Sequence, residues 1–255
     1  MCHGKRDVPR AELHFHLLPD VDDGPVDLDD AVELARLAVA DGTGVVTVTP
    51  HVRDLLSAGI LGEVPARVRD VQRALDAAGV PLELRTGAEL AHDDLPALGD
   101  RQLDAIAHGP PGRRWVLIEA PLFGDADGFL DATAELRARG FGTLIGHPER
   151  CADLMLADGA VARERSAGAL LQVNASSLTG RHGADARAWG IELLRTGTAD
   201  LIASDAHRVT RPPQLSVALE VLAAVGMPPS ALEPLVSDAP RSLLAHGIAP
   251  LRRAA

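Results

Sequence analysis

Strand-like and helix-like segments alternate along most of the chain, and this alternation is the feature that most limits the fold. Predicted strands are short apolar runs at residues 12–16, 45–50, 82–86, 116–119, 143–146, 170–174 and 201–204. Apolar residues at helical spacing predict helices over residues 27–40, 64–78, 128–139, 158–167, 184–196, 213–225 and 229–236. Strands begin roughly every 30 residues, the length of a βαβ unit. We therefore expect an α/β protein with a distorted (β/α)7 TIM-like barrel, and a doubly wound open sheet is the alternative.

The length fits one large domain of this kind. The chain has 255 residues, without a linker or a low-complexity tract that would divide it. We expect a single domain over residues 1–255, in which roughly the first ten and last five residues are peripheral. Aromatic residues make up only 2%, so the core must consist of Leu, Val, Ala and Ile.

Charge and cysteine content exclude several classes of function. The net charge of −11 argues against non-specific nucleic-acid binding and against a basic membrane-surface patch. No segment approaches the ~18 uninterrupted apolar residues of a membrane span, so we expect a cytoplasmic protein without membrane insertion. Cys2 and Cys151 are too few for a disulfide framework. Neither cysteine begins the Cys-x5-Arg loop of a thiol phosphatase.

Residues that can bind metal ions follow most of the predicted strands. His14 and His16 are two residues apart in a strand, so their imidazoles point to the same face. On its own, such a pair is as often two partly buried histidines with ordinary hydrogen bonds as it is part of a metal site. Later strand ends and loops add Asp23, His51, Glu89, Glu119, His147, Asp205 and His207. Because the carboxyl ends of barrel strands open onto one face, we expect these side chains to gather there.

Five imidazoles and four carboxylates exceed what one ion can use, so the set predicts a multinuclear metal site. Nitrogen and oxygen ligands without cysteine suit Mn, Fe, Co or Zn better than soft metals. Three divalent ions and four carboxylates leave a formal excess of two positive charges, which matches a phosphate dianion. Clustered ions of this kind can clamp both the attacking and the leaving oxygen of a phosphoryl group.

The order of short motifs resembles a known family. These motifs are His-x-His at 14–16, Asp-Asp-Gly at 22–24, Thr-Pro-His at 49–51, Gly-x-Glu at 87–89, Ile-Glu-x-Pro at 118–121, His-Pro-Glu-Arg at 147–150, Gln-Val-Asn-Ala-x-Ser-Leu-Thr-Gly at 172–180 and Ser-Asp-Ala-His at 204–207. Together they resemble the PHP (polymerase and histidinol phosphatase) superfamily. Within it, they most resemble the bacterial manganese-dependent tyrosine-protein phosphatases of capsule and exopolysaccharide biosynthesis. The resemblance implies the PHP fold, a distorted seven-stranded barrel that holds three divalent metal ions, with manganese expected first.

The resemblance also implies roles for individual residues. The first metal would be held by His14, His16, Glu89 and Asp205, and Glu89 would bridge to the second. Glu119 and His147 would complete the second metal site, and Asp23, His51 and His207 would hold the third. The family places a phosphate-binding arginine after the fifth-strand motif and another after the seventh. Arg150 matches the first, and Arg211 is the candidate for the second although its loop is shorter than expected.

The implied function is hydrolysis of phosphotyrosine in a protein, with the tyrosine-rich tail of a bacterial tyrosine kinase as the expected partner. A small-molecule PHP phosphatase acting on histidinol phosphate or a nucleotide is the alternative, and a non-catalytic metal-binding module is a third hypothesis. Glu119 favours the tyrosine-phosphatase branch, since other branches usually have histidine there. An amidohydrolase would need a lysine between its metals, and the only lysine is Lys5, ahead of the first strand.

The remaining polar residues near these motifs are expected to play supporting or surface roles. We expect Asp22, Glu149 and Asn174 to support the metal ligands. Three histidines outside the ligand set are expected at the surface: His3, His108 and His246. His92 and His182 lie in loops at the barrel mouth, where a substrate contact is the alternative to the solvent-exposed role that we expect. The sequence offers no obvious general acid.

Overall fold

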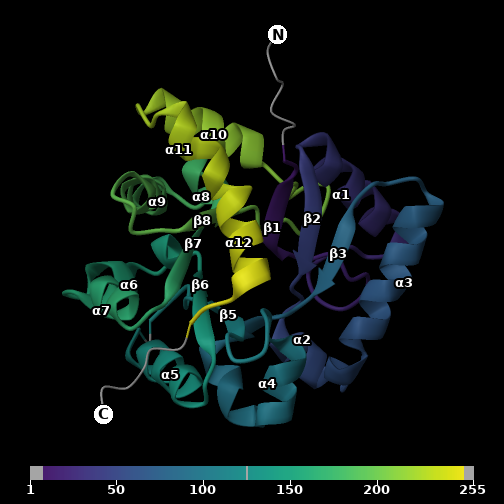
Figure 1. The fold of residues 1–255 in the computed structure, drawn as a ribbon, viewed down its shortest axis with the longest axis horizontal. Coiled ribbons are helices and arrows are strands. Elements are labelled where there is room, and N and C mark those ends of the chain that lie inside the picture. Colours follow the sequence, from purple (N-terminus) through teal and green to yellow (C-terminus); the bar gives the residue numbers. More distant parts are fainter. Residues whose placement is uncertain (1–7, 125, 250–255) are drawn as a thin grey trace.

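The computed structural model describes residues 8–124 and 126–249, and in this part of the chain the strands are parallel (Figure 1). One sheet has the order β1 (Arg10–Phe15), β2 (Thr43–Val48), β3 (Glu83–Thr86). A second sheet has the order β4 (Glu89–Ala91), β5 (Trp115–Glu119), β6 (Gly142–Gly146), β7 (Leu170–Asn174), β8 (Leu201–Ala203). The prediction of an α/β fold with parallel strands is therefore confirmed.

Two isolated backbone bridges connect the two sheets. Phe15 pairs with Ala206, which joins the end of β1 to the segment after β8. His51 pairs with Glu89, which joins the segment after β2 to the start of β4. The buried carboxylate of Glu12 adds a contact at the first junction, because its Oε2 accepts the Ser204 N–H at 2.7 Å. The first and last strands of the chain are therefore held side by side.

The third predicted strand is interrupted. Its expected range of 82–86 corresponds to β3, but residues 87 and 88 break the ladder and β4 begins at Glu89. Gly87 fits at this break because the ring of His108 lies against it, and an added Cβ would be 2.3 Å from Cε1 of His108. His108 is itself buried and stacked on Trp115, so the expectation of a surface histidine was wrong.

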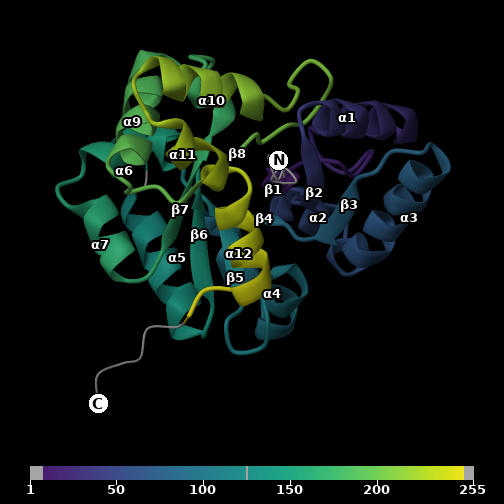
Figure 2. The same ribbon diagram turned by 45° about the horizontal axis from the view of Figure 1, so that its top comes forward.

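Helices cover the outer side of the strands (Figures 1 and 2). The predicted long helices are present as α1 (Leu28–Ala40), α3 (Val64–Ala77), α5 (Ala126–Ala138), α9 (Ala184–Arg195) and α10 (Leu215–Ala224). Two predicted helices are shorter than expected, α7 (Ala160–Ser166) and α11 (Pro229–Leu232). The sequence did not predict α2 (Val52–Ser57), α4 (Asp100–Ile106), α6 (Ala152–Leu156), α8 (Ala175–Leu178) and α12 (Asp238–His246).

Local sequence explains where α1 begins and which side it buries. The Asp27 side chain caps the helix by accepting the Asp30 N–H, which satisfies one of the free donors of the first turn. The buried positions are Ala31, Leu34, Ala35 and Ala38, which recur at the spacing of one helical face. These side chains join the large apolar core between helices and strands.

A second, smaller apolar cluster packs at the amino-terminal end of the strands. It consists of Leu13, Trp115, Leu117, Leu144, Leu201, Leu243 and Ile248. Leu243 belongs to α12, which runs across the middle of both views (Figures 1 and 2). Two hydrogen bonds connect α12 and the residues after it to segments that precede strands: Arg241 donates to the Pro9 carbonyl, and the Ile248 N–H donates to the Arg113 carbonyl. Apolar side chains therefore fill the amino-terminal end of the strands, and polar side chains can gather at the carboxyl end.

In the described residues, no helix is both long enough and apolar enough to cross a membrane. Most of the terminal stretches expected to be peripheral, together with Cys2, His3 and Lys5, lie outside the described residues.

Candidate metal centre

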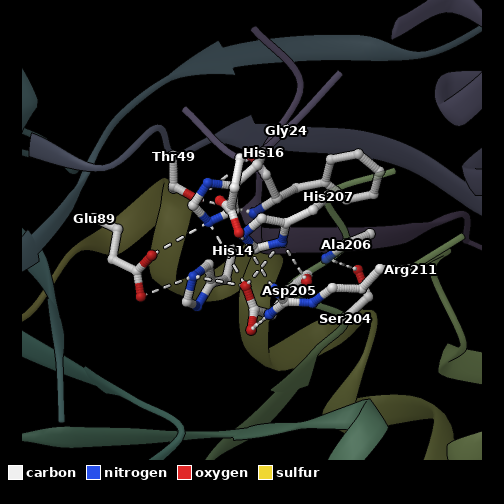
Figure 3. A network of polar contacts seen from close by, with 12 residues as sticks. His14, His16, Gly24, Thr49, Glu89, Ser204, Asp205, Ala206, His207 and Arg211 are labelled. Atoms are coloured by element: carbon white, nitrogen blue, oxygen red, sulfur yellow. Dashed lines mark hydrogen bonds and ion pairs between the residues drawn. The ribbon is translucent and has the colours of Figure 1, made fainter. Parts of the chain in front are cut away.

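All nine predicted metal ligands come together where the strands end. Figure 3 shows five of them, His14, His16, Glu89, Asp205 and His207. Four overlapping groups have ligand atoms within 4.8 Å of one another. The groups are His16–Asp23–His51–His207, His14–His16–Asp205, His14–Glu89–His147 and His51–Glu89–Glu119. Because residues are shared between groups, the set forms one continuous cluster.

Glu89 lies at the centre of this cluster. Its Oε1 is 3.0 Å from Nε2 of His14 and 3.3 Å from Nε2 of His147. Its Oε2 is 3.2 Å from Nε2 of His16 and 3.1 Å from Nδ1 of His51. The two oxygens of one carboxylate therefore face two different pairs of imidazoles, as a ligand that bridges two ions would.

The Asp205 carboxylate divides its two oxygens between the imidazoles and a set of donors. Oδ1 is 3.3 Å from Nε2 of His14 and 3.6 Å from Nε2 of His16. Oδ2 accepts a hydrogen bond from Nδ2 of Asn174 at 2.8 Å. The same oxygen pairs with Arg211 and lies 3.4 Å from Nη1 of Arg150 (Figure 3). Both predicted phosphate-binding arginines thus reach the edge of the cluster through one carboxylate.

Three of the histidines are held in the orientation that a metal ligand needs. Nδ1 of His14 is 2.9 Å from Oε1 of Gln172, and Nδ1 of His16 is 2.7 Å from Oδ2 of Asp22. Nδ1 of His207 is 2.9 Å from the backbone carbonyl of Asp205. Since these oxygens accept hydrogen bonds, Nδ1 carries the proton and the Nε2 lone pair faces the cluster.

Buried polar atoms at the centre lack partners. Among the described residues, Nε2 of His14, Nε2 of His16 and Oε2 of Glu89 are buried and make no hydrogen bond. Leaving such atoms without a partner is costly, and a lone pair of nitrogen facing a carboxylate oxygen is repulsive. A cation between them removes both penalties, so the residues present fit a divalent metal ion.

The ionisation of the cluster reflects burial and close opposite charges. Burial alone would raise the pKa of Glu89, but His14 and His51 hold it well below the usual value. Burial would lower the pKa of His51, but Glu89 and Asp23 raise it to about 9. Burial and the neighbouring Glu89 raise the pKa of Glu119 to about 7. Without cations, the carboxylates are thus neutralised partly by imidazolium ions and partly by protonation.

Two of the candidate ligands lie on strained backbone. His147 has φ of 37° and Asp205 has φ of 53°, in the left-handed region that residues other than glycine seldom adopt. Such conformations cost on the order of 1–3 kcal/mol and concentrate at functional sites. His147 directly follows β6, and Asp205 is the second residue after β8, so the strained turns aim their side chains into the cluster.

The expected supporting residues are partly confirmed. Asp22 contacts His16 and also accepts the His51 N–H at 3.1 Å, and Asn174 contacts Asp205, as expected. Gln172, which orients His14, was not predicted although it lies in the quoted motif around residue 174. Glu149 contacts none of the ligand imidazoles; its Oε1 accepts the Asn174 N–H and the Ser177 hydroxyl.

Fold and site together define a class: α/β proteins that gather imidazole and carboxylate metal ligands at the carboxyl ends of parallel strands. The family model for capsular polysaccharide synthesis proteins CpsB/CapC matches residues 10–244. The chain therefore belongs to the CpsB/CapC family.

Individual relatives agree with this assignment. The tyrosine-protein phosphatase YwqE of Bacillus subtilis is 30% identical over 209 residues, which is 78% of this chain and 77% of YwqE. CapC of Staphylococcus aureus is 28% identical over 204 residues, 79% of this chain and 78% of CapC.

Solved structures extend the likeness to three dimensions. A structure from the work on YwqE and on CpsB of Streptococcus pneumoniae, described as unique metal-dependent tyrosine phosphatases, superposes with a TM-score of 0.77 at 25% identity. It covers 95% of this chain and 100% of that chain. The phosphotriesterase homology protein of Escherichia coli shares the fold alone, with a TM-score of 0.60 at 12% identity over 91% of this chain and 97% of that chain.

Proposed function

We propose that the chain is a metal-dependent phosphomonoesterase that hydrolyses phosphotyrosine in proteins. The observation that carries the proposal is the Asp205 carboxylate, with one oxygen on the imidazole cluster and the other on Arg150 and Arg211. This arrangement places metal ligands and guanidinium groups on the two sides of one carboxylate. Guanidinium groups are the preferred partners of phosphate oxygens. The name of YwqE and the description of the CpsB and YwqE structures support phosphotyrosine as the substrate.

We further propose three divalent ions, with manganese as the first candidate and iron, cobalt or zinc as alternatives. His14, His16, Glu89 and Asp205 would hold the first; Glu89, Glu119 and His147 the second; Asp23, His51 and His207 the third. When bound, such ions neutralise phosphate charge and acidify a water molecule at neutral pH. Two groups of ligand atoms support the first and third sets. The second set is supported by Nε2 of His147, which is 3.3 Å from Oε1 of Glu89 and 3.6 Å from Oε1 of Glu119. The two sheets with their two bridges support the distorted seven-stranded barrel.

The protein's own residues bind and orient the phosphoryl group. Arg150 and Arg211 are partly buried, with side chains 17% and 20% exposed, so a phosphate that enters can reach both. Both arginines already contact the Asp205 carboxylate. A phosphate that binds them would therefore replace these carboxylate contacts as well as water. Asn174 would keep Asp205 in place during this exchange.

We propose a tyrosine-phosphorylated segment of a protein as the partner, of the kind found in the tail of a bacterial tyrosine kinase that controls polysaccharide export. Membership of a capsular polysaccharide synthesis family supports this choice. The buried Cys151 supports a mechanism without a thiolate, since burial raises the pKa of its thiol.

The experiment compares matched phosphotyrosine and phosphoserine peptides, with histidinol phosphate alongside and manganese present. A phenol has a pKa of about 10, so the tyrosyl oxygen leaves more readily than a serine alkoxide. We expect kcat/KM for phosphotyrosine to exceed that for phosphoserine by at least about 100-fold, which is about 2.7 kcal/mol of barrier. Faster turnover of histidinol phosphate than of every phosphotyrosine peptide would instead assign a small-molecule phosphatase.

A further inference from the structure

A chain of hydrogen bonds leads from a buried carboxylate to a histidine beside the proposed phosphate site. Ser177 donates its hydroxyl hydrogen to Oε1 of Glu149 at 2.7 Å, and its oxygen is 2.9 Å from Nδ1 of His182. Glu149 and Ser177 are fully buried, whereas His182 is partly buried. This chain of three residues is separate from the nine candidate metal ligands.

The hydrogen bonds fix the tautomer of His182. Oε1 of Glu149 already accepts the Asn174 N–H at 3.0 Å, so it acts as an acceptor toward Ser177 as well. The single hydroxyl hydrogen of Ser177 is therefore used, and its oxygen can only accept from Nδ1 of His182. Nε2 of His182 keeps its lone pair and has no hydrogen-bond partner among the residues that the structure describes. The arrangement resembles the way in which a carboxylate orients the imidazole of a hydrolytic triad.

Hydrogen bonds also connect His182 to the proposed phosphate site. Oε1 of Glu149, which accepts from Ser177, also accepts the Asn174 N–H. Nδ2 of Asn174 in turn donates to Oδ2 of Asp205, the oxygen that contacts both arginines.

His182 lies between α8 and α9, in the loop that follows the carboxyl end of β7, on the same side as the metal cluster. Its electrostatic neighbours come from several elements: Arg150, Asp205, His147 and Arg211. Burial and then Arg150 lower the pKa of His182 to about 3, so the ring is neutral before a substrate arrives.

We propose that His182 is a catalytic residue that carries a proton to the leaving tyrosyl oxygen through Nε2. The inference rests on the proposed phosphatase function and adds to it the acid that the sequence did not reveal. An imidazole whose Nδ1 is held by a hydrogen bond and whose Nε2 is free can take and give a proton without moving.

The proton balance closes without a further reactant. The second pKa of a phosphate ester is about 6, so near neutral pH part of the substrate is a monoanion with one phosphate proton. Burial and Arg150 disfavour a proton on His182 in the free protein. The negative charge of a phosphoryl group bound at Arg150 and Arg211 offsets this effect, so the phosphate proton can pass to Nε2 of His182. As water adds its oxygen to phosphorus, the P–O bond breaks and its electron pair goes to the tyrosyl oxygen. The tyrosyl oxygen takes the proton from Nε2, both protons of the water stay on the released phosphate as H2PO4−, and His182 is neutral again.

The test compares leaving groups in a His182→Phe variant, which keeps an aromatic ring but cannot carry a proton. Phenyl phosphate needs protonation of its leaving oxygen, whereas 2,4-dinitrophenyl phosphate has a far less basic leaving group. We expect kcat for phenyl phosphate to fall about 100-fold, in the range of general acid catalysis. The kcat for the dinitrophenyl ester should change less than about threefold, which also shows that the metal site is intact.

Two further variants separate the proton role from simple packing. Ser177→Ala removes the orienting oxygen while His182 remains, so it should show the same dependence on leaving group in weaker form. His246→Gln, on the exposed end of α12, is the matched control and should leave both substrates unchanged.

Equal losses for both esters in His182→Phe, or no loss for phenyl phosphate, would overturn the role of His182 while the phosphatase function stands. A wild-type protein that hydrolyses neither ester with manganese bound would overturn the phosphatase function and this inference with it.

Discussion

A single carboxylate, that of Glu89, faces four imidazoles of the site, and its loss should be more damaging than the loss of any one histidine. We expect Glu89→Gln to lower turnover of an aryl phosphate by more than about 100-fold, beyond the 10–100-fold typical of residues that only support metal ligands. Elemental analysis should show fewer bound ions per chain than in the wild type. Full metal content with near-normal turnover would contradict the central position of Glu89.

Serine in place of Cys151 provides the control for this substitution. Cys151 is buried, and its Sγ accepts the Leu154 N–H at 3.4 Å, a role that a serine hydroxyl also fills. Neither Cys151→Ser nor Cys2→Ser should alter turnover, because no thiolate takes part. An inactive serine variant would reopen a thiol mechanism.

His108 gives the folded state a defined sensitivity to acid. Burial and Arg114 lower its pKa to about 3, well below the usual value of 6.5. As the pH falls below 6.5 the unfolded chain binds a proton that the folded chain does not, so His108 destabilises the fold progressively toward pH 3. At pH 5 this loss is about 2 kcal/mol, since one pKa unit corresponds to 1.36 kcal/mol.

Urea unfolding of the metal-free protein at pH 8 and pH 5 tests this expectation. The free energy of unfolding should fall between pH 8 and pH 5 by about 2 kcal/mol less in His108→Phe than in the wild type. A change in packing caused by the substitution affects both pH values equally and therefore cancels in this comparison. An identical pH dependence in both proteins would show that His108 is protonated or exposed in the folded state.

The sequence revealed the metal-binding residues much better than the residues that support them. His14, His16 and the later ligands could be predicted because imidazoles and carboxylates after apolar strands have no packing role. Gln172 and Ser177 could not, because a polar residue in a strand or a short helix gains its role only from distant partners, here His14 and the Glu149–His182 pair. The same reason explains why His108 was expected at the surface: its partner Trp115 comes after a turn.

At the scale of elements, the break between β3 and β4 depends on the smallest residue. Gly87→Ala would place Cβ 2.3 Å from the His108 ring and 2.9 Å from Cγ2 of Thr47. We expect a destabilisation of about 1–3 kcal/mol, as for other overpacked sites. Because β4 begins two residues later with Glu89, metal affinity should fall as well.

A double variant and a second glycine test whether the contact with His108 is the cause. Thermal unfolding of Gly87→Ala combined with His108→Ala should show less than the sum of the two separate losses, because the smaller side chain makes room. Gly62→Ala is the matched control, since an added Cβ there meets nothing within 4 Å. Strict additivity in the double variant would point to another cause.

The order of elements was predicted better than their ends and breaks. Long helices such as α1 and α10 carry clear apolar periodicity, and the strands carry apolar runs. The short helices α2 and α8 follow strand ends and span too few residues for a periodic signal. The start of β4 was not predicted, because the strand is interrupted at Gly87, where the ring of His108 packs. His108 lies 21 residues further along the chain, so the local sequence does not reveal this contact.

At the scale of the molecule, the candidate metal ligands come from both sheets, so bound ions should stabilise the whole fold. Free metal at 100 times its dissociation constant contributes about 2.7 kcal/mol. For a protein of this size that corresponds to a Tm increase of roughly 5–10 °C. Thermal unfolding with manganese and with a chelator measures the difference, which Glu89→Gln should largely abolish. A Tm independent of metal would contradict a site shared between the sheets.

The contact between the first and last strands also constrains how the protein is made. His14 and His16 are synthesised long before their neighbours Asp205 and His207, which lie roughly 190 residues further along the chain. β1 waits equally long for Ala206 and Ser204. Such distant pairings form late, after the segments between them have been synthesised. The complete ligand set therefore exists only after translation of β8, and the growing chain cannot assemble it. The ion that is finally bound is then chosen from the metals available to the nearly finished protein.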